Sequence, residues 1–153
     1  MTYSIDTSAI LDGWVRHYPI DVFPRLWANL DSLIRENRLW ASGEVLRELA
    51  AKDDDVFGWA KQRPQLIVEL DEDVQAATSE ILAVFQTMVD TMKGRSRADP
   101  FVIAVARVRG STVVTGEKNR GTRDRPRIPL VCQHFGVPCI DLLGLIRAGG
   151  WRF

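Results

Sequence analysis

Short runs of β-branched and aromatic residues alternate along this chain with longer stretches of helical periodicity. The first run, residues 2–6, leads into a pattern whose apolar positions include Ile10, Leu11 and Trp14. Strands that are separated by helices pair in parallel, with helices packed on both faces of the sheet. The sequence therefore predicts an α/β fold of three layers, α/β/α, with a central parallel sheet.

The other elements are assigned from periodicity and from turn residues. We expect further strands at 39–42, 66–70, 111–116 and 137–140, although 66–70 can also be the approach to a helix. We expect helices at 7–18, 21–38, 42–52, 53–63, 71–93, 99–110, 128–136 and 141–150. The candidate helix caps are Thr7 or Ser8, Ser42 and Asp99.

Composition excludes several classes of protein. Of 153 residues, 46% are hydrophobic and 26% are charged, which is typical of a globular domain. No apolar run approaches the ~20 residues that span a bilayer. The first residues lack the basic start and the cleavage site of a secretory signal, so we expect a cytoplasmic protein without a membrane partner. We find no repeat and no linker, and expect residues 1–153 to form a single domain.

The two cysteines, Cys132 and Cys139, are too few for a disulfide scaffold, and their apolar surroundings favour buried thiols. Zinc bound by both thiols and His134 is an alternative. A structural zinc site needs four ligands, however, and the other histidine, His17, is distant in the sequence. Zinc is therefore not expected.

Acidic residues fall near the ends of the expected strands. Asp6 ends the first strand and Glu117 follows the strand at 111–116. Asp99 begins a helix, and Glu48 lies in the helix after 39–42. In parallel α/β sheets the functional crevice lies at the carboxyl ends of the strands, so the connectivity allows these four residues to meet at one edge.

Carboxylates that lie close together raise each other's pKa unless a cation neutralises them. Oxygen ligands without His or Cys favour a hard cation such as Mg²⁺ or Mn²⁺. Two such ions can activate a water and stabilise the leaving oxygen in phosphodiester cleavage. Simpler structural roles remain possible: Asp6 and Asp99 can serve only as helix caps, and Glu48 can be an exposed helix residue that competes with Glu44.

Charge is unevenly distributed, although the net charge is zero. Residues 1–92 contain 8 Lys and Arg against 16 Asp and Glu, whereas residues 93–127 contain 10 against 3. A basic segment beside an acidic site suits a polyanionic substrate, and a solvated charged loop is the alternative. The candidate contacts to a phosphate backbone are Arg95, Arg97, Lys118, Arg120, Arg123, Arg125 and Arg127.

Four motifs, in order, resemble those of the PIN-domain ribonucleases, which include many nucleases of bacterial toxin–antitoxin pairs. They are Asp-Thr-Ser after a strand (6–8), Ser followed six positions later by Glu-Leu (42–49), Ala-Asp opening a buried helix (98–99), and Val-Val-Thr-Gly-Glu (113–117). Each motif alone is weak, but their order and spacing cover nearly the whole chain. The ending resembles a PIN-like branch with an Ile-Pro-x-x-Cys helix (128–132) and a Gly-Trp-x-Phe tail (150–153).

The resemblance implies a PIN-like fold and a metal-dependent endoribonuclease that hydrolyses RNA with Mg²⁺ or Mn²⁺. Asp6 and Asp99 would bind metal directly, Glu48 would bind the metal or its water, and Glu117 would complete the catalytic site. The resemblance also implies a toxin held by an antitoxin or another regulatory partner protein. Homodimers are common in the family.

Ser8 and Thr115 would, by the same resemblance, orient carboxylates or touch phosphate. Ser8 can equally be a helix cap, and Thr115 an ordinary strand residue.

The chain departs from the family at Glu117, where Asp is usual, and in the length of segment 53–93. An alternative function is therefore a catalytically weak PIN-like module that binds RNA or protein. A phosphatase is disfavoured because position 8 is Ser where one common type needs a second Asp. A phosphoacceptor domain is disfavoured because no Lys lies near the last strand.

Overall fold

A parallel sheet organises the computed structural model, which describes residues 1–88 and 98–153. Its strand order is β3-β2-β1-β4-β5, so the first strand of the chain lies at the centre. The strands are β1 (Tyr3–Ile5), β2 (Leu39–Ser42), β3 (Ile67–Val68), β4 (Thr112–Val114) and β5 (Cys139–Ile140). Their carboxyl ends therefore face one edge of the molecule, as predicted.

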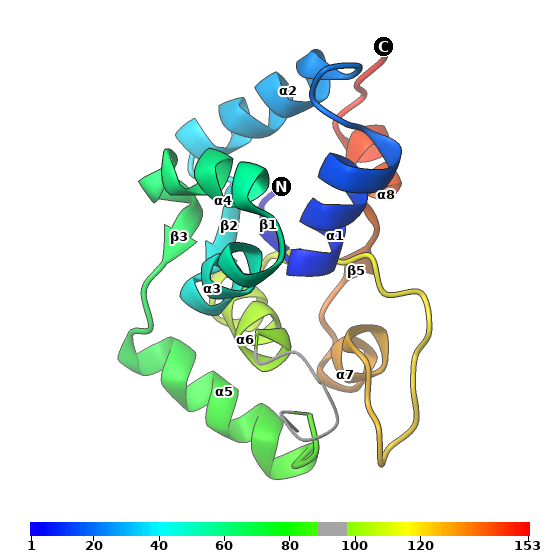
Figure 1. Cartoon of the computed structure of the whole chain (residues 1–153). Coiled ribbons are helices and arrows are strands. Elements are labelled where there is room, and N and C mark those ends of the chain that lie inside the picture. Colours follow the sequence, from blue (N-terminus) through cyan, green and yellow to red (C-terminus); the bar gives the residue numbers. More distant parts are fainter. Residues whose placement is uncertain (89–97) are drawn as a thin grey trace.

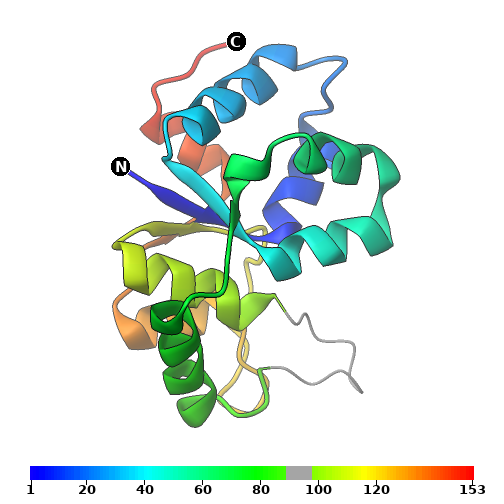
Figure 2. The ribbon, with the colours of Figure 1, turned by 90° about the vertical axis from the view of Figure 1, so that its left-hand side faces the viewer.

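Helices cover both faces of this sheet and give the predicted three-layer α/β/α architecture (Figures 1 and 2). Figure 2 shows α6 (Asp99–Arg109) and α7 (Ile128–Phe135) below the sheet, with α5 (Glu72–Val84) packed against α6. The layer above contains α1 (Thr7–Leu11), α2 (Pro24–Arg35), α4 (Asp54–Lys61) and α8 (Leu142–Ala148). Between β2 and α4 lies α3 (Gly43–Lys52).

Helix α6 is buried almost all round because it lies between the sheet and α5. Val102 and Ile103 are fully buried, and the Ser4 hydroxyl of β1 donates a hydrogen bond to the Val102 carbonyl at 2.8 Å. Gly110 ends the helix in the left-handed conformation, with φ of 63°. This packing fixes the first residue of α6, Asp99, relative to the end of β1.

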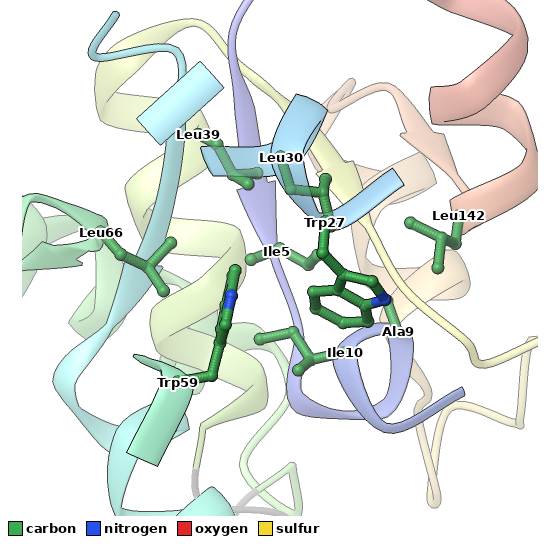
Figure 3. Close-up of a pocket in the computed structure, with 9 residues that line it drawn as sticks. All are labelled: Ile5, Ala9, Ile10, Trp27, Leu30, Leu39, Trp59, Leu66 and Leu142. Carbon is green, nitrogen blue, oxygen red and sulfur yellow. The ribbon is translucent and has the colours of Figure 1, made fainter. Parts of the chain in front are cut away.

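The opposite face of the sheet packs against large aromatic and aliphatic side chains. Trp27 and Trp59 make an edge-to-face contact, with ring centroids 5.0 Å apart. They line a small apolar cavity of about 10 Å³ together with Ile5 and Leu142 (Figure 3). The tryptophans of this layer are thus core residues. The polar residues of the candidate site lie instead at the strand ends.

The first expected helix, 7–18, changes type partway. After α1 the chain forms a π-helix, η1 (Asp12–His17), in which the Tyr18 N–H donates to the Gly13 carbonyl at 2.8 Å. A Cβ atom at Gly13 would lie 2.8 Å from Leu142 Cδ2, so α8 packs directly on this turn. This contact is tertiary and has no counterpart in the periodicity of the sequence.

The expected helix at 71–93 was too long. Helix α5 ends at Val84, and the following residue, Phe85, leaves helical geometry and is buried. Residues 89–93 lie outside the described part of the chain. The short segments η2 (Pro64–Leu66) and β3 confirm a strand within 66–70.

None of the three proposed caps forms a side-chain capping bond, and Asp99 is described with the candidate site. Neither the Thr7 nor the Ser8 hydroxyl caps α1, because both donate to carboxylates described below. Ser42 precedes α3 but makes no side-chain capping bond. Across the described residues, the structure contains no helix long and apolar enough to cross a membrane.

Candidate metal centre

Asp6 follows the central strand and is almost completely buried, with 2% of its surface exposed. Its backbone N–H donates to the Val114 carbonyl of β4 at 2.8 Å, which holds it beside the neighbouring strand end. Its Oδ2 accepts hydrogen bonds from Ser8 Oγ at 2.5 Å and Thr115 Oγ1 at 3.0 Å. The two hydroxyls that we predicted to orient carboxylates therefore both contact Asp6.

The pKa of the Asp6 carboxyl rises from 3.8 to about 6. Burial is the main cause, because it disfavours the charged form. The negative charges of Glu117 and Glu48 raise the pKa as well, while the hydrogen bonds from Ser8 and Thr115 lower it. The hydroxyls only partly offset the loss of water, so a nearby cation would stabilise this carboxylate.

Asp99 stands in the first turn of α6 and is 6% exposed. It was predicted as a possible helix cap, but Ala98 occupies the cap position and offers no side-chain capping bond. Pro100 suits the next position because an N–H at the start of a helix has no partner within the helix. The Asp99 carboxylate is therefore placed by the packing of α6, not by a capping role.

Glu117 lies just past β4, and 16% of its side chain is exposed. The turn before it is tightly packed, because a Cβ atom at Gly116 would lie 3.0 Å from the Ser8 carbonyl oxygen and would displace the Asp12 carboxylate. Glu117 Oε2 accepts the N–H of Ile128, the first residue of α7, at 2.8 Å. Its Oε1 lies 3.9 Å from Arg127 Nη1. The carboxylate thus connects the start of the loop 117–127 to its end.

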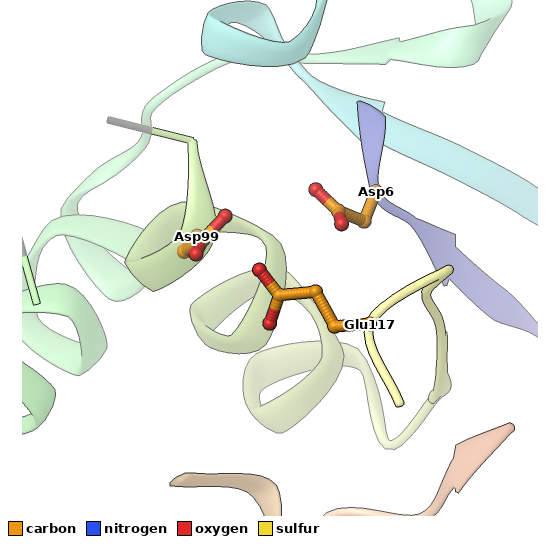
Figure 4. Close-up of side chains that lie close together, drawn as sticks. All are labelled: Asp6, Asp99 and Glu117. Atoms are coloured by element: carbon orange, nitrogen blue, oxygen red, sulfur yellow. The ribbon is translucent and has the colours of Figure 1, made fainter. Parts of the chain in front are cut away.

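These three carboxylates converge from segments that are far apart in the sequence (Figure 4). Asp6, Asp99 and Glu117 each offer one oxygen, and these oxygens all lie within 4.8 Å of one another. Two oxygens bound to one cation can be at most twice the metal–oxygen distance apart, which is about 4.2 Å for Mg²⁺ and up to about 5.2 Å for Ca²⁺. The group therefore fits a shared divalent cation, and its oxygen-only chemistry favours a hard one.

Glu48, the fourth predicted ligand, lies outside this group. Its Oε1 accepts a hydrogen bond from Thr7 Oγ1 at 2.6 Å, and its charge contributes to the raised pKa of Asp6. It is therefore near the acidic group but not part of it. Glu48 lies on α3, which follows β2, whereas Glu117 follows β4 on the other side of the central strand β1.

Sequence reasoning did not assign site roles to Thr7 and Ser42. Thr7 connects the first strand end to Glu48, as described above. The Ser42 hydroxyl is buried without a hydrogen-bond partner among the described residues, and Ser42 lies two residues beyond the paired Ser4 and Trp40, as Asp6 does. Its position at a strand end was a signal that could have identified it.

The basic residues of the loop 117–127 surround the same edge. Lys118, Arg120, Arg123, Arg125 and Arg127 are all exposed. The loop folds back on itself, because Gly121 pairs with Pro126 and the Arg127 N–H donates to the Arg120 carbonyl at 3.2 Å. The other two predicted backbone contacts, Arg95 and Arg97, lie outside the described residues.

Within residues 1–88 and 98–153, Asp6, Asp99 and Glu117 form the only cluster with the geometry of a metal site. His134 packs against the rings of Phe85 and Phe135, at centroid distances of 5.2 and 4.8 Å.

Comparison with known proteins bears on the fold. The chain is similar to the solved structure of FitAcB from Neisseria gonorrhoeae, with a TM-score of 0.50 and 22% identity over 92% of this chain and 96% of that chain. This similarity, with the sheet described above, identifies a three-layer PIN-like fold. No curated protein matches the chain in sequence. Because residues 3–153 match its pattern, the chain belongs to the family described as "Domain of unknown function (DUF4411)".

Proposed function

We propose that this protein is a metal-dependent endoribonuclease that hydrolyses RNA phosphodiester bonds. One observation carries the proposal: Asp6, Asp99 and Glu117, on three separate elements, bring oxygens to within 4.8 Å of one another. Burying mutually repelling carboxylates costs stability and has no structural benefit unless a cation is bound. The PIN-like fold and the resemblance of the four motifs to PIN-domain ribonucleases support a catalytic role for this cation.

In this proposal Asp6, Asp99 and Glu117 hold Mg²⁺ or Mn²⁺. A divalent cation supplies charge stabilisation to the phosphodiester transition state and lowers the pKa of a water. The protein contributes a fixed arrangement: Ser8 and Thr115 hold the Asp6 carboxylate, and the Ile128 N–H holds Glu117. Such preorganised groups need not reorient during the reaction.

Glu48 has a supporting role in this scheme. Its hydrogen bond to Thr7 fixes it beside the acidic group, at a position that suits contact through a water. The exposed Lys and Arg residues of the loop 117–127 would bind the phosphate backbone without reading its sequence. Single-stranded RNA is the favoured substrate, because a recessed site cannot reach phosphates in a stacked duplex as easily.

The resemblance to PIN-domain ribonucleases also supports a proposal about the biological role of the protein. We propose that the protein acts as a toxin and that an antitoxin or another regulatory protein is its partner. A homodimer is compatible with this assignment. We further propose that residues 1–153 act as one domain and that the protein works in the cytoplasm.

A second candidate is a PIN-like module that binds RNA or protein without efficient catalysis. One observation favours it: an oxygen of Glu117 is already engaged by the Ile128 N–H, which leaves less of this carboxylate for a cation.

A cleavage assay with purified protein, Mn²⁺ and a labelled single-stranded RNA separates the two. We expect the wild type to cut and Asp6→Asn and Asp99→Asn to lose cutting by at least ~100-fold, the scale of losing a preorganised charge-stabilising group. Asp21→Asn, which changes an exposed aspartate on a turn, should cut like the wild type. Equal cutting by all four proteins would mean a contaminating nuclease, and no cutting by any would favour the binding module.

A further inference from the structure

A groove adjoins the acidic group at the carboxyl ends of β4 and β5. It has a cavity volume of about 610 Å³, within the ~300–1,000 Å³ of small-molecule sites. Thr115 and Glu117 line it, so the groove begins at the candidate metal centre. Its other walls come from the loop after β4, from α7 and from the end of β5.

The lining of this groove combines positive charge, apolar surface and an amide, beside the carboxylates of Glu117 and Asp141. Lys118 and Arg120 provide positive charge on the loop side. Val137 and Ile140 provide apolar surface, and Gln133 on α7 provides an amide. A nucleotide has matching parts, since its base has apolar faces and hydrogen-bonding edges and its phosphate is anionic.

The amide of Gln133 is held in place. Its Oε1 accepts a hydrogen bond from Arg120 Nη2, which links α7 to the basic loop. The amide nitrogen of the same side chain is a hydrogen-bond donor, and Gln133 is one of the residues that line the groove. An acceptor on the edge of a base is the complementary group.

We propose that this groove binds the base of the nucleotide next to the phosphodiester that is cut. The inference rests on the proposed ribonuclease function and adds to it a binding site and a requirement for an unstacked base. The continuity of the groove with Thr115 and Glu117 carries it, because a base in the groove places its own phosphate beside the acidic group. A paired base could not enter, so the groove also explains a preference for single-stranded RNA.

Cys139 provides a test that does not depend on cleavage. It lines the groove and is partly exposed, whereas Cys132, the other cysteine, is fully buried. A hydrogen bond from the Cys132 thiol lowers the pKa of Cys139, which favours its reaction with a maleimide. Only one thiol is therefore accessible to the reagent.

The labelling experiment uses N-ethylmaleimide and the Asp99→Asn variant, in which the RNA stays intact. We expect a single-stranded oligoribonucleotide, at a concentration that saturates binding by fluorescence polarisation, to slow labelling of Cys139 severalfold. An oligomer of the same length with a ribose-phosphate backbone and no bases should protect much less. Equal labelling with and without saturating RNA would overturn the proposal.

A second experiment compares wild type, Gln133→Ala and the matched control Gln75→Ala on an exposed face of α5. Substrates carry one abasic position, moved stepwise past the cut site. We expect the wild type to cut about tenfold less well when the base in the groove is missing, which corresponds to about 1.4 kcal/mol of lost binding free energy. Gln133→Ala should reduce the ratio of cutting between the intact and the abasic substrate, and Gln75→Ala should keep the wild-type ratio.

The two hypotheses fail in different ways. If Asp6→Asn still cuts RNA as the wild type does, the ribonuclease assignment is wrong. If cutting needs Asp6 but the ratio between intact and abasic substrates is the same in all three proteins, the ribonuclease assignment stands and the base-binding groove is wrong.

Discussion

Glu117 is one methylene longer than the aspartate usual at this position in the resembling family, and the structure shows what that length reaches. Its Oε2 accepts the N–H of Ile128, which is one of the N–H groups that a helix start leaves unpaired. An oxygen of the same residue lies within 4.8 Å of those of Asp6 and Asp99. One side chain thus connects the acidic group to α7, and the change from Asp does not by itself remove a carboxylate from the site.

Two substitutions of Glu117 separate these interactions. Glu117→Gln keeps an oxygen that can accept from Ile128 but loses the charge, so metal-free stability should stay near that of the wild type and stabilisation by Mn²⁺ should fall. Glu117→Ala should lose both, with about 1 kcal/mol less free energy of unfolding from the missing cap. Urea unfolding with and without Mn²⁺ measures both effects. If the two variants lost the same free energy of unfolding in metal-free buffer, this result would argue against the capping role of Glu117.

Asp6 predicts a dependence of stability on pH. Its pKa is about 6 in the folded protein and 3.8 in the unfolded chain, so between these values the folded state holds a proton that the unfolded state has lost. This contribution to stability is complete below pH ~3.8 and is lost as pH rises through ~6. The loss amounts to about 3 kcal/mol for the two-unit shift.

Asp6→Asn cannot ionise and should lack this step. In metal-free buffer the variant should gain stability relative to wild type as pH rises from 4 to 7.5, measured by urea unfolding at each pH. Mn²⁺ at pH 7.5 should reduce the difference in free energy of unfolding between the two proteins, because it should stabilise only the wild type. A difference between the two proteins that is the same at pH 4 and pH 7.5 would contradict the raised pKa of Asp6.

At the scale of elements, the sequence predicted those whose signals are local. Helix α6 was predicted from its apolar residues, with Pro100 at its start and Gly110 at its end, and the structure confirms it. The π-helix after α1 and the end of α5 were missed, because packing against Leu142 and burial of Phe85 decide them. Neither of these interactions is visible in the periodicity of the chain.

In the candidate site, too, some residues could be predicted from the sequence and others depend on packing. Asp6 and Glu117 could be predicted because parallel strands place their carboxyl ends, and the residues that follow them, along one edge. Asp99 could be predicted because the helix that leads into β4 begins at that same edge. Glu48 was predicted to join them, but its place on α3 depends on how that helix packs. The buried hydroxyl of Ser42 was missed because burial, not residue type, makes it notable.

Helix α6 carries Asp99, so its packing should control the site. Ile103→Ala should create a cavity against the sheet and lower the free energy of unfolding by about 2–5 kcal/mol. Val108→Ala, on the same helix at a position 39% exposed, should cost less than about 0.5 kcal/mol. Chemical denaturation measures both. Equal effects at the two positions would show that α6 does not pack as described.

At the scale of the whole molecule, opposite charges lie side by side. The carboxylates of Asp6 and Asp99 are buried at the sheet edge, while the basic residues of the loop 117–127 are exposed beside it. The loop begins at Glu117, just past β4, and leads into α7, so its basic residues follow directly on one of the three carboxylates. A polyanion can therefore be attracted by the loop while its scissile phosphate needs a cation to approach the carboxylates.

This arrangement predicts how RNA binding responds to salt. Removing one phosphate interaction should reduce the slope of log Kd against log salt by about 0.7 for single-stranded RNA. The double variant Arg123→Ala, Arg125→Ala should therefore bind more weakly, with a slope smaller by about 1.4. The control Arg25→Ala, Arg35→Ala removes the same charge from exposed positions on α2 and should keep the wild-type slope.

Fluorescence polarisation of a labelled oligoribonucleotide between about 50 and 200 mM salt, the range over which phosphate interactions change affinity strongly, measures these slopes. The Asp99→Asn background keeps the RNA intact. If the two double variants lose affinity equally and keep equal slopes, net charge alone attracts the RNA, and the RNA does not bind along the loop. If only the loop variant changes, the interactions are local, and the path of the RNA runs from the loop 117–127 to the carboxylates beside β4.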